Sequence, residues 1–396
     1  MTQARLGIHA VGLVTPLGAG KDENAGKLFS GTRSGLATEV DILLDRRVRA
    51  GCVTSALPAP PDGFGRYQSR NNRLMLLALQ EIAPEVAAAR ERFGSSRVAV
   101  VLGTSTSGIA EGEAAFAAHH STGQWPAAFD YRQQELGSLA NFAAAVLQVT
   151  GPAFTIATAC SSSAKVFASA RRLIRAGICD AAVVGGADTI CRTTLNGFAS
   201  LDAMSRGLCN PFSRNRDGIN IGEGAAAFLL TREAAQISLL GCGESSDAHH
   251  LSAPDPTGAG AKMAMSAALG DAGILASDID YVNLHGTGTS LNDSMEGVAV
   301  HSLFGGEVPC SSTKAMTGHM LGAAGACEAA FLWLSLARGG QLPPHLWDGV
   351  QDPAIPTLNL VEAGARLPSN NRSAMMSNSF AFGGNNMALI LGRGDW

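Results

Sequence analysis

The chain has 396 residues, of which 46% are hydrophobic and 47 are glycine, and this indicates a compact α/β protein with a large core. A net charge of −4 gives no support for nucleic-acid binding. Apolar runs fall short of the ~18 residues that suggest a membrane span, and the N-terminal run shows no signal-peptide cleavage pattern. Eight cysteines lack metal-ligand spacing. We therefore expect a cytoplasmic protein with no metal, membrane span or nucleic-acid partner.

Strand and helix signals alternate along the chain, which favours layers of helices against sheet. The first strands are predicted at residues 5–15, 97–104, 153–159, 179–188 and 225–231. Helices between them are predicted near residues 72–92, 135–149 and 162–177. Later strands are predicted at residues 237–245, 280–286, 308–313, 372–379 and 386–392. Their helices are predicted near residues 258–273, 293–304 and 322–338.

The two sets of elements have the same order, which an internal duplication explains. VAVVLGT corresponds to YVNLHGT, TIATAC to PCSSTK, and AAVVGGAD to AMMSNSFAFGG. We therefore predict an N-terminal half, residues 1–233, and a C-terminal half, residues 234–396. Two segments of the first half, 104–134 and 188–222, have no counterpart in the second. Such insertions are expected to cap a site or form an interface.

Cys160 follows the apolar segment FTIATA and precedes three serines, which favour helix starts. A thiol at a strand-to-helix turn lies near the positive end of a helix dipole, so its pKa is expected to be lowered. The structural alternative is a buried, inert cysteine. The predicted duplication decides in favour of a site, because equivalent strand ends would bring Cys160 close to His285, Lys314 and the loop at Phe382.

The motifs of the second half carry further candidates. His285 leaves a strand into a Gly-Thr-Gly-Thr turn, and on its own it is as compatible with a structural role as with catalysis. Lys314 and His319 stand in a polar turn before MLGAAGACEAA, a small-residue helix suited to close packing. Phe382 precedes two glycines, so it is either core or a movable gate.

Over essentially its whole length the chain resembles the β-ketoacyl-acyl-carrier-protein synthases, the elongating ketosynthases of the thiolase superfamily. The resemblance rests on TACSSS, HGTGT, SSTKAMTGHMLGAAGA, NSFAFGGNN and NPFSRNRDGINIGEGAA, which occur in the family's order. It implies duplicated α/β halves in a layered α-β-α-β-α architecture. His319 matches the Cys-His-His class, whereas third-class initiating enzymes and plant polyketide synthases carry asparagine there. Thiolases have a second catalytic cysteine, and chain-length factors lack the nucleophile.

The resemblance also implies an acyltransferase mechanism. Cys160 takes an acyl group from the phosphopantetheine arm of an acyl carrier protein, and the backbone N–H groups of Cys160 and Phe382 stabilise the oxyanion. His285 and His319 then stabilise the enolate formed when a malonyl thioester loses carbon dioxide. Lys314 orders the site and holds His285, and Glu296 is expected to support it by pairing with Lys314.

Departures from the family pattern concern the substrate. The gate around Phe382 and Gly383 carries Ala381 where the family has glycine, and Asn385 where it has threonine. The residues expected to line the acyl pocket are Thr104, Thr106, Phe198 and Ile219. Small hydroxyl residues suggest a polar, unsaturated or aryl-bearing chain. As the function, we therefore favour type II polyketide or polyene elongation slightly over housekeeping fatty-acid elongation. A catalytically silent partner subunit and a degradative thiolase are the further alternatives.

The resemblance also implies partners. Family members form homodimers through strands like residues 181–188, while some specialised ketosynthases pair with a cysteine-less homologue. Acyl carrier proteins are acidic, and the basic residues expected to meet both the acylated and the malonylated carrier are Arg66, Arg70, Arg73 and Arg206. No cofactor is expected to bind the chain itself, since phosphopantetheine arrives on the carrier. Acyl-chain identity, pathway, dimer type and the protonation state of His319 stay open at this point.

Overall fold

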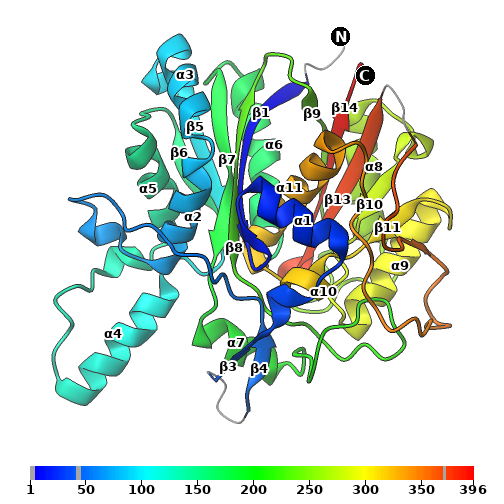
Figure 1. The fold of residues 1–396 in the computed structure, drawn as a ribbon, viewed down its shortest axis with the longest axis horizontal. Coiled ribbons are helices and arrows are strands. Elements are labelled where there is room, and N and C mark those ends of the chain that lie inside the picture. The colour runs from blue at the N-terminus through cyan, green and yellow to red at the C-terminus, as the bar shows by residue number, and fades with distance from the viewer. Residues whose placement is uncertain (1–4, 42–45, 369–371) are drawn as a thin grey trace.

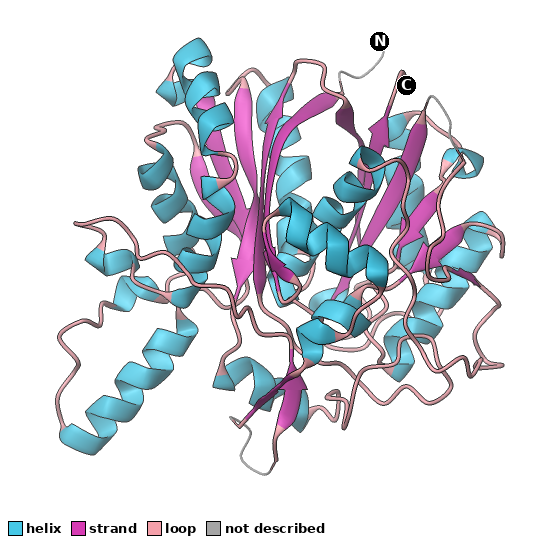
Figure 2. Cartoon of the chain, in the orientation of Figure 1, coloured by secondary structure: helices cyan, strands magenta, loops and turns pink. Residues whose placement is uncertain are grey.

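The computed structural model describes residues 5–41, 46–368 and 372–396, and its helices and strands form a layered α/β molecule (Figures 1 and 2). The first-half strands lie in the order β6-β5-β7-β8-β1 and the second-half strands in the order β11-β10-β13-β14-β9. The first-half strands are β1 (Leu6–Thr15), β5 (Val98–Gly103), β6 (Ala153–Ile156), β7 (Ala181–Asp188) and β8 (Gly224–Thr231). The second-half strands are β9 (Ile237–Ser246), β10 (Tyr281–Asn283), β11 (Pro309–Ser311), β13 (Ser373–Ala381) and β14 (Asn385–Arg393).

These two orders are the same once β1 is matched with β9, β5 with β10 and so on, so the predicted repeat is confirmed at the level of topology. The half-sheets join where β1 pairs antiparallel with β9 at Leu6–Leu239 and Gly7–Ser238. The join makes one twelve-stranded sheet, which also includes β2 (Gly18–Ala19) and β12 (Asn359–Leu360). The boundary between residues 233 and 234 stays a prediction.

Helices form three layers around the two half-sheets (Figure 1). The inner layer contains α6 (Ser162–Arg175) and α11 (Ala324–Ala337), and both contribute to one central apolar cluster with strands of both halves. The outer layers are α2 (Arg70–Gln80), α3 (Ala83–Phe93) and α5 (Ser138–Leu147) on the first half, and α8 (Ala259–Ala272) and α9 (Ser290–Phe304) on the second. The expected α-β-α-β-α fold is confirmed.

Alternation along the strands explains why each half-sheet is covered on both faces. On β5, Ala99 and Val101 belong to the central cluster, whereas Val98 and Val100 belong to the outer one. Successive side chains of a strand point to opposite faces, so an apolar strand needs a helix layer on each side. This requirement explains the near-continuous apolar runs that identified the strands.

Several elements differ from the predicted ones. The helix predicted at 72–92 is two helices, because Pro84, in the first turn of α3, lacks the N–H that would continue α2. Besides the four-residue α10 (Lys314–Thr317), three longer helices and a hairpin were not predicted. They are α1 (Lys21–Ser30), α4 (Ile109–Thr122), α7 (Arg192–Ser200) and the pair β3 (Thr38–Val40) and β4 (Val48–Ala50). Helices α4 and α7 lie in the two insertions, and α4 projects away from the body (Figure 1).

The candidate residues all follow the carboxyl ends of strands. Cys160 follows β6, His285 follows β10, Lys314 opens the short α10 (Lys314–Thr317) after β11, and Phe382 follows β13. Strands β10, β11 and β13 are parallel, and ligand sites of open α/β sheets gather beyond the carboxyl ends of parallel strands. Among the described residues, no helix is both long and apolar enough to cross a membrane.

Candidate active site

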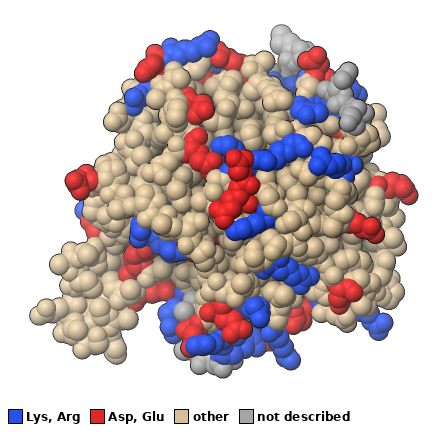
Figure 3. Space-filling model, in the orientation of Figure 1, with Lys and Arg blue, Asp and Glu red and all other residues tan. Residues whose placement is uncertain are grey.

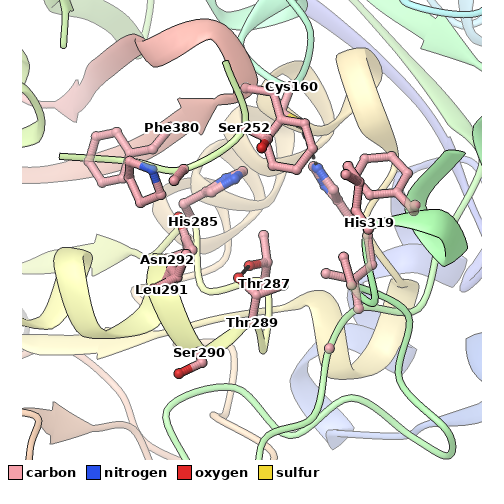
Figure 4. A pocket seen from close by; sticks show the side chains of 18 of the residues that line it. Cys160, Ser252, His285, Thr287, Thr289, Ser290, Leu291, Asn292, His319 and Phe380 are labelled. Atoms are coloured by element: carbon pink, nitrogen blue, oxygen red, sulfur yellow. Dashed lines mark hydrogen bonds between the residues drawn. The ribbon is translucent and has the colours of Figure 1, made fainter. Parts of the chain in front are cut away.

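A thiol and two imidazoles meet in a buried cluster where the two halves of the fold come together. Donor atoms of Cys160, His285 and His319 lie within 4.8 Å of one another. Nε2 of His319 is 2.9 Å from Sγ of Cys160, and the two imidazole rings are 5.3 Å apart between centroids. Figure 4 shows the imidazoles approaching the region of Cys160 from opposite sides. The structure thus brings together three residues separated by up to 159 positions.

The turn that carries Cys160 is shaped by its neighbours. Ala159 has a positive φ of 50°, and the Ser162 hydroxyl accepts the Thr158 N–H and donates to the Ala159 carbonyl. These bonds link the end of β6 to the start of α6. Ser161 and Ser162 therefore build the turn itself, and Ser161 makes no side-chain cap. The Ser163 hydroxyl instead accepts the Ala326 N–H of α11 at 2.9 Å.

The expected lowering of the pKa of Cys160 is wrong for the free protein. Burial raises the pKa of Cys160 to about 11, although the Lys314 ammonium and the backbone N–H groups of Phe382 and Cys160 oppose the rise. The resting Cys160 side chain is therefore a neutral thiol. The same two N–H groups are the ones expected to form the oxyanion hole, and their effect on the sulfur shows that they lie within its reach.

Both histidines are neutral. Burial, followed by the Lys314 charge, holds the pKa values of His285 and His319 well below the usual 6.5. Neither Nδ1 atom has a hydrogen-bond partner among the described residues. A buried lone pair without a partner costs less than a buried N–H without one, so we place the hydrogen of each ring on Nε2. Each imidazole then presents a hydrogen-bond donor.

The backbone of each histidine is fixed separately. The N–H groups of His285 and Gly286 both donate to the carboxylate of Glu296 at 2.7 Å. The His319 N–H donates to the Asn220 carbonyl at 2.7 Å, and the His319 carbonyl accepts the Gly222 N–H at 2.8 Å. The sequence motif at 210–226 therefore serves to position His319.

A pH prediction follows from the neutral imidazoles. Because both histidine pKa values lie well below 6.5, neither imidazole is expected to add a break to the pH profile of malonyl-thioester decarboxylation between about pH 6 and 8. The neighbouring group that titrates in this range is Glu296, whose pKa burial raises to about 7. The measurement is kcat/KM for carbon dioxide release across that range. A break near pH 6.5 in the wild type, absent from the His285→Ala and His319→Ala variants, would contradict the assignment.

Lys314 is paired with Glu328 of α11, and both side chains are 1% exposed. The expected pairing of Lys314 with Glu296 is therefore wrong, because Glu296 is taken up by the His285 turn and by the Asn378 side chain. Within the described part of the chain, the Lys314 ammonium hydrogen-bonds to Glu328 and not to His285, and it acts on both imidazoles through its charge. The expectation that Lys314 orders the site electrostatically is consistent with this arrangement.

Breaking the buried pair is expected to destabilise the protein. Glu328→Gln leaves the Lys314 cation buried without a counter-ion, which typically costs about 3–5 kcal/mol. The matched control is Glu23→Gln, which removes an exposed pair with Lys27 and is expected to cost less than about 1 kcal/mol. Urea unfolding measures both variants. A loss for Glu328→Gln as small as that for the control would contradict the prediction.

The same cluster was considered as a metal centre. Cysteine and histidine are ligands that zinc prefers, and the three donor atoms are close enough to share an ion. However, the Lys314 ammonium is near enough to lower the pKa values of all three groups. A buried positive charge beside the cluster opposes the binding of a divalent cation, so the cluster is poorly suited to hold a metal ion.

The gate segment lies over the thiol. The Phe382 ring is 37% exposed and 5.4 Å from the Phe198 ring of α7, measured between centroids. Gly383 has a φ of 80° and donates its N–H to the Leu251 carbonyl at 2.7 Å. Ala381 is extended, with φ −110° and ψ 154°, so its Cβ causes no strain in this conformation. Asn385 accepts a hydrogen bond from Lys165 at 3.2 Å.

The site opens into a cavity of about 350 Å³. Phe198 and Ile219 line it, together with Cys160, both histidines and Phe382. Thr104 and Thr106 do not line this cavity, and their predicted place in the acyl pocket stays a prediction. Their hydroxyls donate to Oδ1 of the buried Asp188 at 2.7 and 2.8 Å, so they satisfy a carboxylate and do not make a pocket polar.

The predicted carrier-binding arginines do not form one surface. Arg70 binds the buried Glu223 and the Val53 carbonyl, and Arg73 binds the carbonyls of residues 57 and 58. Both therefore have structural roles. Arg66 lies over the Tyr67 ring. Arg206 is exposed, and its N–H donates to Asp217, a residue of the cavity wall.

Charges on the surface are mixed. Figure 3 shows basic and acidic side chains interspersed over one face, with both signs gathered at the end of the molecule where β3 and β4 lie. Of the four arginines, Arg206 alone is thus both exposed and hydrogen-bonded to a residue at the rim of the cavity.

Sequence reasoning also missed Glu328 and Asp188. The signal for Glu328 was present, since it is the one carboxylate in an otherwise small and apolar helix.

The duplicated fold with a Cys-His-His cluster at the junction of its halves places the chain in the thiolase-like class. Two family models agree. The model of the β-ketoacyl synthase N-terminal domain matches residues 5–236, and that of the β-ketoacyl synthase C-terminal domain matches residues 237–347. The chain belongs to the β-ketoacyl synthase family.

Individual relatives give the same result. A 3-oxoacyl-[acyl-carrier-protein] synthase 2 of Rhizobium meliloti (strain 1021) is 40% identical over 281 residues, which is 65% of this chain and 65% of the relative. The aligned part thus falls just short of two thirds of that curated relative. A chain of the solved ketosynthase ApeO in complex with its chain length factor ApeC, from Xenorhabdus doucetiae, is 47% identical with a TM-score of 0.93, covering 98% of both chains. The ishigamide ketosynthase/chain length factor is 26% identical, with a TM-score of 0.89 and coverage of 99% and 100%.

Proposed function

We propose that this chain catalyses decarboxylative Claisen condensation between an acyl group held on Cys160 and a malonyl-acyl-carrier protein. The observation that carries the proposal is the buried cluster of Cys160, His285 and His319, one thiol and two neutral imidazole donors within 4.8 Å. Family membership supports it. The product is a β-ketoacyl-acyl-carrier protein, longer by two carbons.

In the first step the Cys160 sulfur attacks the thioester carbonyl of an acylated carrier. The C–S bond to the carrier breaks, and the thiol proton is transferred overall to the departing phosphopantetheine sulfur. The Nε2–H of His319, 2.9 Å from Sγ, stabilises negative charge as it develops on the sulfur. The N–H groups of Cys160 and Phe382 receive the tetrahedral oxyanion.

In the second step a malonyl thioester occupies the same cavity. Its carboxylate leaves as carbon dioxide, and the electron pair of the broken C–C bond forms an enolate. The Nε2–H groups of His285 and His319 donate to the enolate oxygen. The enolate carbon attacks the Cys160 thioester, the bond between the acyl carbon and Sγ breaks, and the released thiolate takes a proton from water to restore the thiol. Lys314 favours each anionic stage by its charge.

This function requires phosphopantetheine on the carrier, and no residue of this chain is assigned to a bound cofactor. The acyl and malonyl carriers are the proposed partners. A further proposed partner is a second ketosynthase-like chain, which is either a copy of this chain or a chain-length-factor homologue. The ApeO–ApeC and ishigamide structures, in which a ketosynthase is found with a chain length factor, favour the chain-length-factor homologue.

Arg206 is the proposed electrostatic contact for the acidic carrier. Arg206→Glu is expected to raise KM for an acylated carrier at least about tenfold, because one attractive charge becomes repulsive beside the cavity rim. KM for a small thioester mimic should change less than about twofold. Steady-state kinetics with both substrates makes the comparison. Equal increases for the two substrates would remove Arg206 from the carrier surface.

The acyl chain is proposed to belong to type II polyketide or polyene elongation, with housekeeping fatty-acid elongation as the alternative. The hydroxyls of Thr104 and Thr106 no longer support this choice. It rests on Ile219 in the cavity wall and on 47% identity over nearly the whole chain to the ApeO–ApeC structure, against 40% over 65% for the fatty-acid-type relative.

The test is a condensation assay with malonylated carrier and a panel of saturated and polyenoyl carriers, with products read by mass spectrometry. We expect β-ketoacyl products and higher kcat/KM for polyenoyl chains. Faster elongation of saturated medium chains would overturn the pathway assignment. Failure to condense any chain, with and without a chain-length-factor partner, would overturn the reaction itself.

A further inference from the structure

His345 is a buried histidine outside the catalytic cluster with both ring nitrogens engaged. It is 6% exposed. Its Nε2 lies 3.0 Å from the Pro211 carbonyl, which can only accept, so Nε2 carries the hydrogen. Its Nδ1 lies 3.1 Å from the Ser312 N–H and accepts that hydrogen bond. One donor and one acceptor position of the ring are therefore both used by backbone groups.

Ser312 in turn touches both catalytic segments of the second half. Its hydroxyl donates to the Gly286 carbonyl at 2.6 Å, directly after His285. The same oxygen accepts the Lys314 N–H at 3.3 Å. The Gly286 peptide is thus held by Glu296 at its N–H and by Ser312 at its carbonyl. A shift of Ser312 would move the His285 turn, whereas the Lys314 ammonium is held separately by Glu328.

Close packing makes this arrangement sensitive to small shifts. Gly286 has a φ of 38°, and a Cβ placed there would lie 2.6 Å from the Ser312 Cβ and 3.0 Å from the Phe212 ring. Phe212 adjoins Pro211, the other partner of His345. Burial also lowers the pKa of His345 to about 4, so the ring stays neutral and its acceptor is available at neutral pH.

We propose that His345 is a positioning residue for the decarboxylation step, acting through the Ser312 N–H to hold the His285 turn against Lys314. This inference rests on the proposed condensation. It assigns no contact with substrate to His345. The acylation of Cys160 does not need the His285 turn, because its oxyanion donors come from Cys160 and Phe382, so the two half-reactions should respond differently.

Two variants separate the functions of the ring. His345→Asn places an amide oxygen near the position of Nδ1 and keeps an acceptor for Ser312. His345→Gln places an amide nitrogen near Nε2 and keeps the donor to Pro211 but loses the acceptor. We expect His345→Gln to lower the rate of malonyl-thioester decarboxylation about tenfold, because a tenfold change corresponds to the loss of about one buried hydrogen bond. His345→Asn should stay within about threefold of the wild type.

Cys160 acylation, followed by intact-protein mass spectrometry, should change less than about twofold in both variants. Ser312→Ala keeps its N–H but removes the hydroxyl link, and it should reproduce the selective loss without adding to that of His345→Gln in the double variant. If His345→Gln does not fold, Ser312→Ala decides alone. Equal losses in both half-reactions, or no loss in either, would overturn the proposal. A wild type that neither acylates nor decarboxylates would instead overturn the proposed function.

Discussion

Cys160→Ala is expected to abolish acyl transfer and condensation completely. No other thiol can replace Cys160, because its sulfur alone among the described cysteines lies between the two imidazole donors and the N–H groups of the oxyanion hole. Substitution by alanine removes the atom that carries the acyl group and leaves the fold nearly unchanged, since the side chain is small and the turn is held by the serines.

The measurement is product formation from acylated and malonylated carriers, with thermal unfolding to show that the variant folds. Cys52→Ala is the matched control, because Cys52 is a free cysteine outside the cluster. The control should condense at the wild-type rate. Condensation by Cys160→Ala at more than a trace level, or equal loss in the control, would contradict the assignment of the nucleophile.

His285→Ala and His319→Ala are each expected to lower decarboxylation about 100- to 1,000-fold. Each substitution removes one donor to the enolate oxygen, and the loss of one oxyanion donor has effects of that size in buried sites. The acylation of Cys160 should persist in His285→Ala. It should slow in His319→Ala, because the Nε2 of His319 is the group that contacts the sulfur.

Carbon dioxide release and Cys160 acylation are measured separately for the two variants. His301→Ala is the control, because His301 is exposed on the last turn of α9. It should match the wild type in both assays. If either active-site variant decarboxylates within about threefold of the wild type, the corresponding donor is not used.

The repeat of strands and helices in the two halves and the convergence of Cys160 with His285 were predictable from the sequence. Each of these residues ends an apolar strand, and the repeat of the two strand sets relates their positions. Such strands can be identified from the sequence because a strand that is covered on both faces must be apolar along nearly its whole length. The glycine-rich turn after His285 likewise indicates a sharp bend, whatever the position of that turn in the fold.

Pairing between distant side chains was not predictable. Glu296 lies on a helix before Lys314 in the sequence, and Glu328 lies on a helix after it. Only packing shows that Glu328 faces the ammonium while Glu296 binds the His285 turn. The hydroxyl of Thr104 binds Asp188, 84 residues further on. Residue type indicates what a side chain can bind, and the fold decides which partner is near enough to be bound.

The pKa of Cys160 shows the same limit on a smaller scale. Position at a helix start predicts a lowered value, but burial raises it to about 11 in the folded protein. The sequence indicates the helix start without indicating how deeply the thiol lies. Nucleophilicity then depends on donors supplied by His319 and by the gate, which belong to the other half of the fold.

The central claim is that the acyl group passes through Cys160. Wild-type enzyme should be mixed with a single equivalent of acylated carrier, quenched, and analysed by intact-protein and peptide mass spectrometry, before and after a chase with malonylated carrier. The account predicts a mass increase equal to the acyl group on the peptide that contains Cys160, lost on the chase as an equal amount of β-ketoacyl product appears. Product formed without that adduct, or an adduct that survives the chase, would contradict the account.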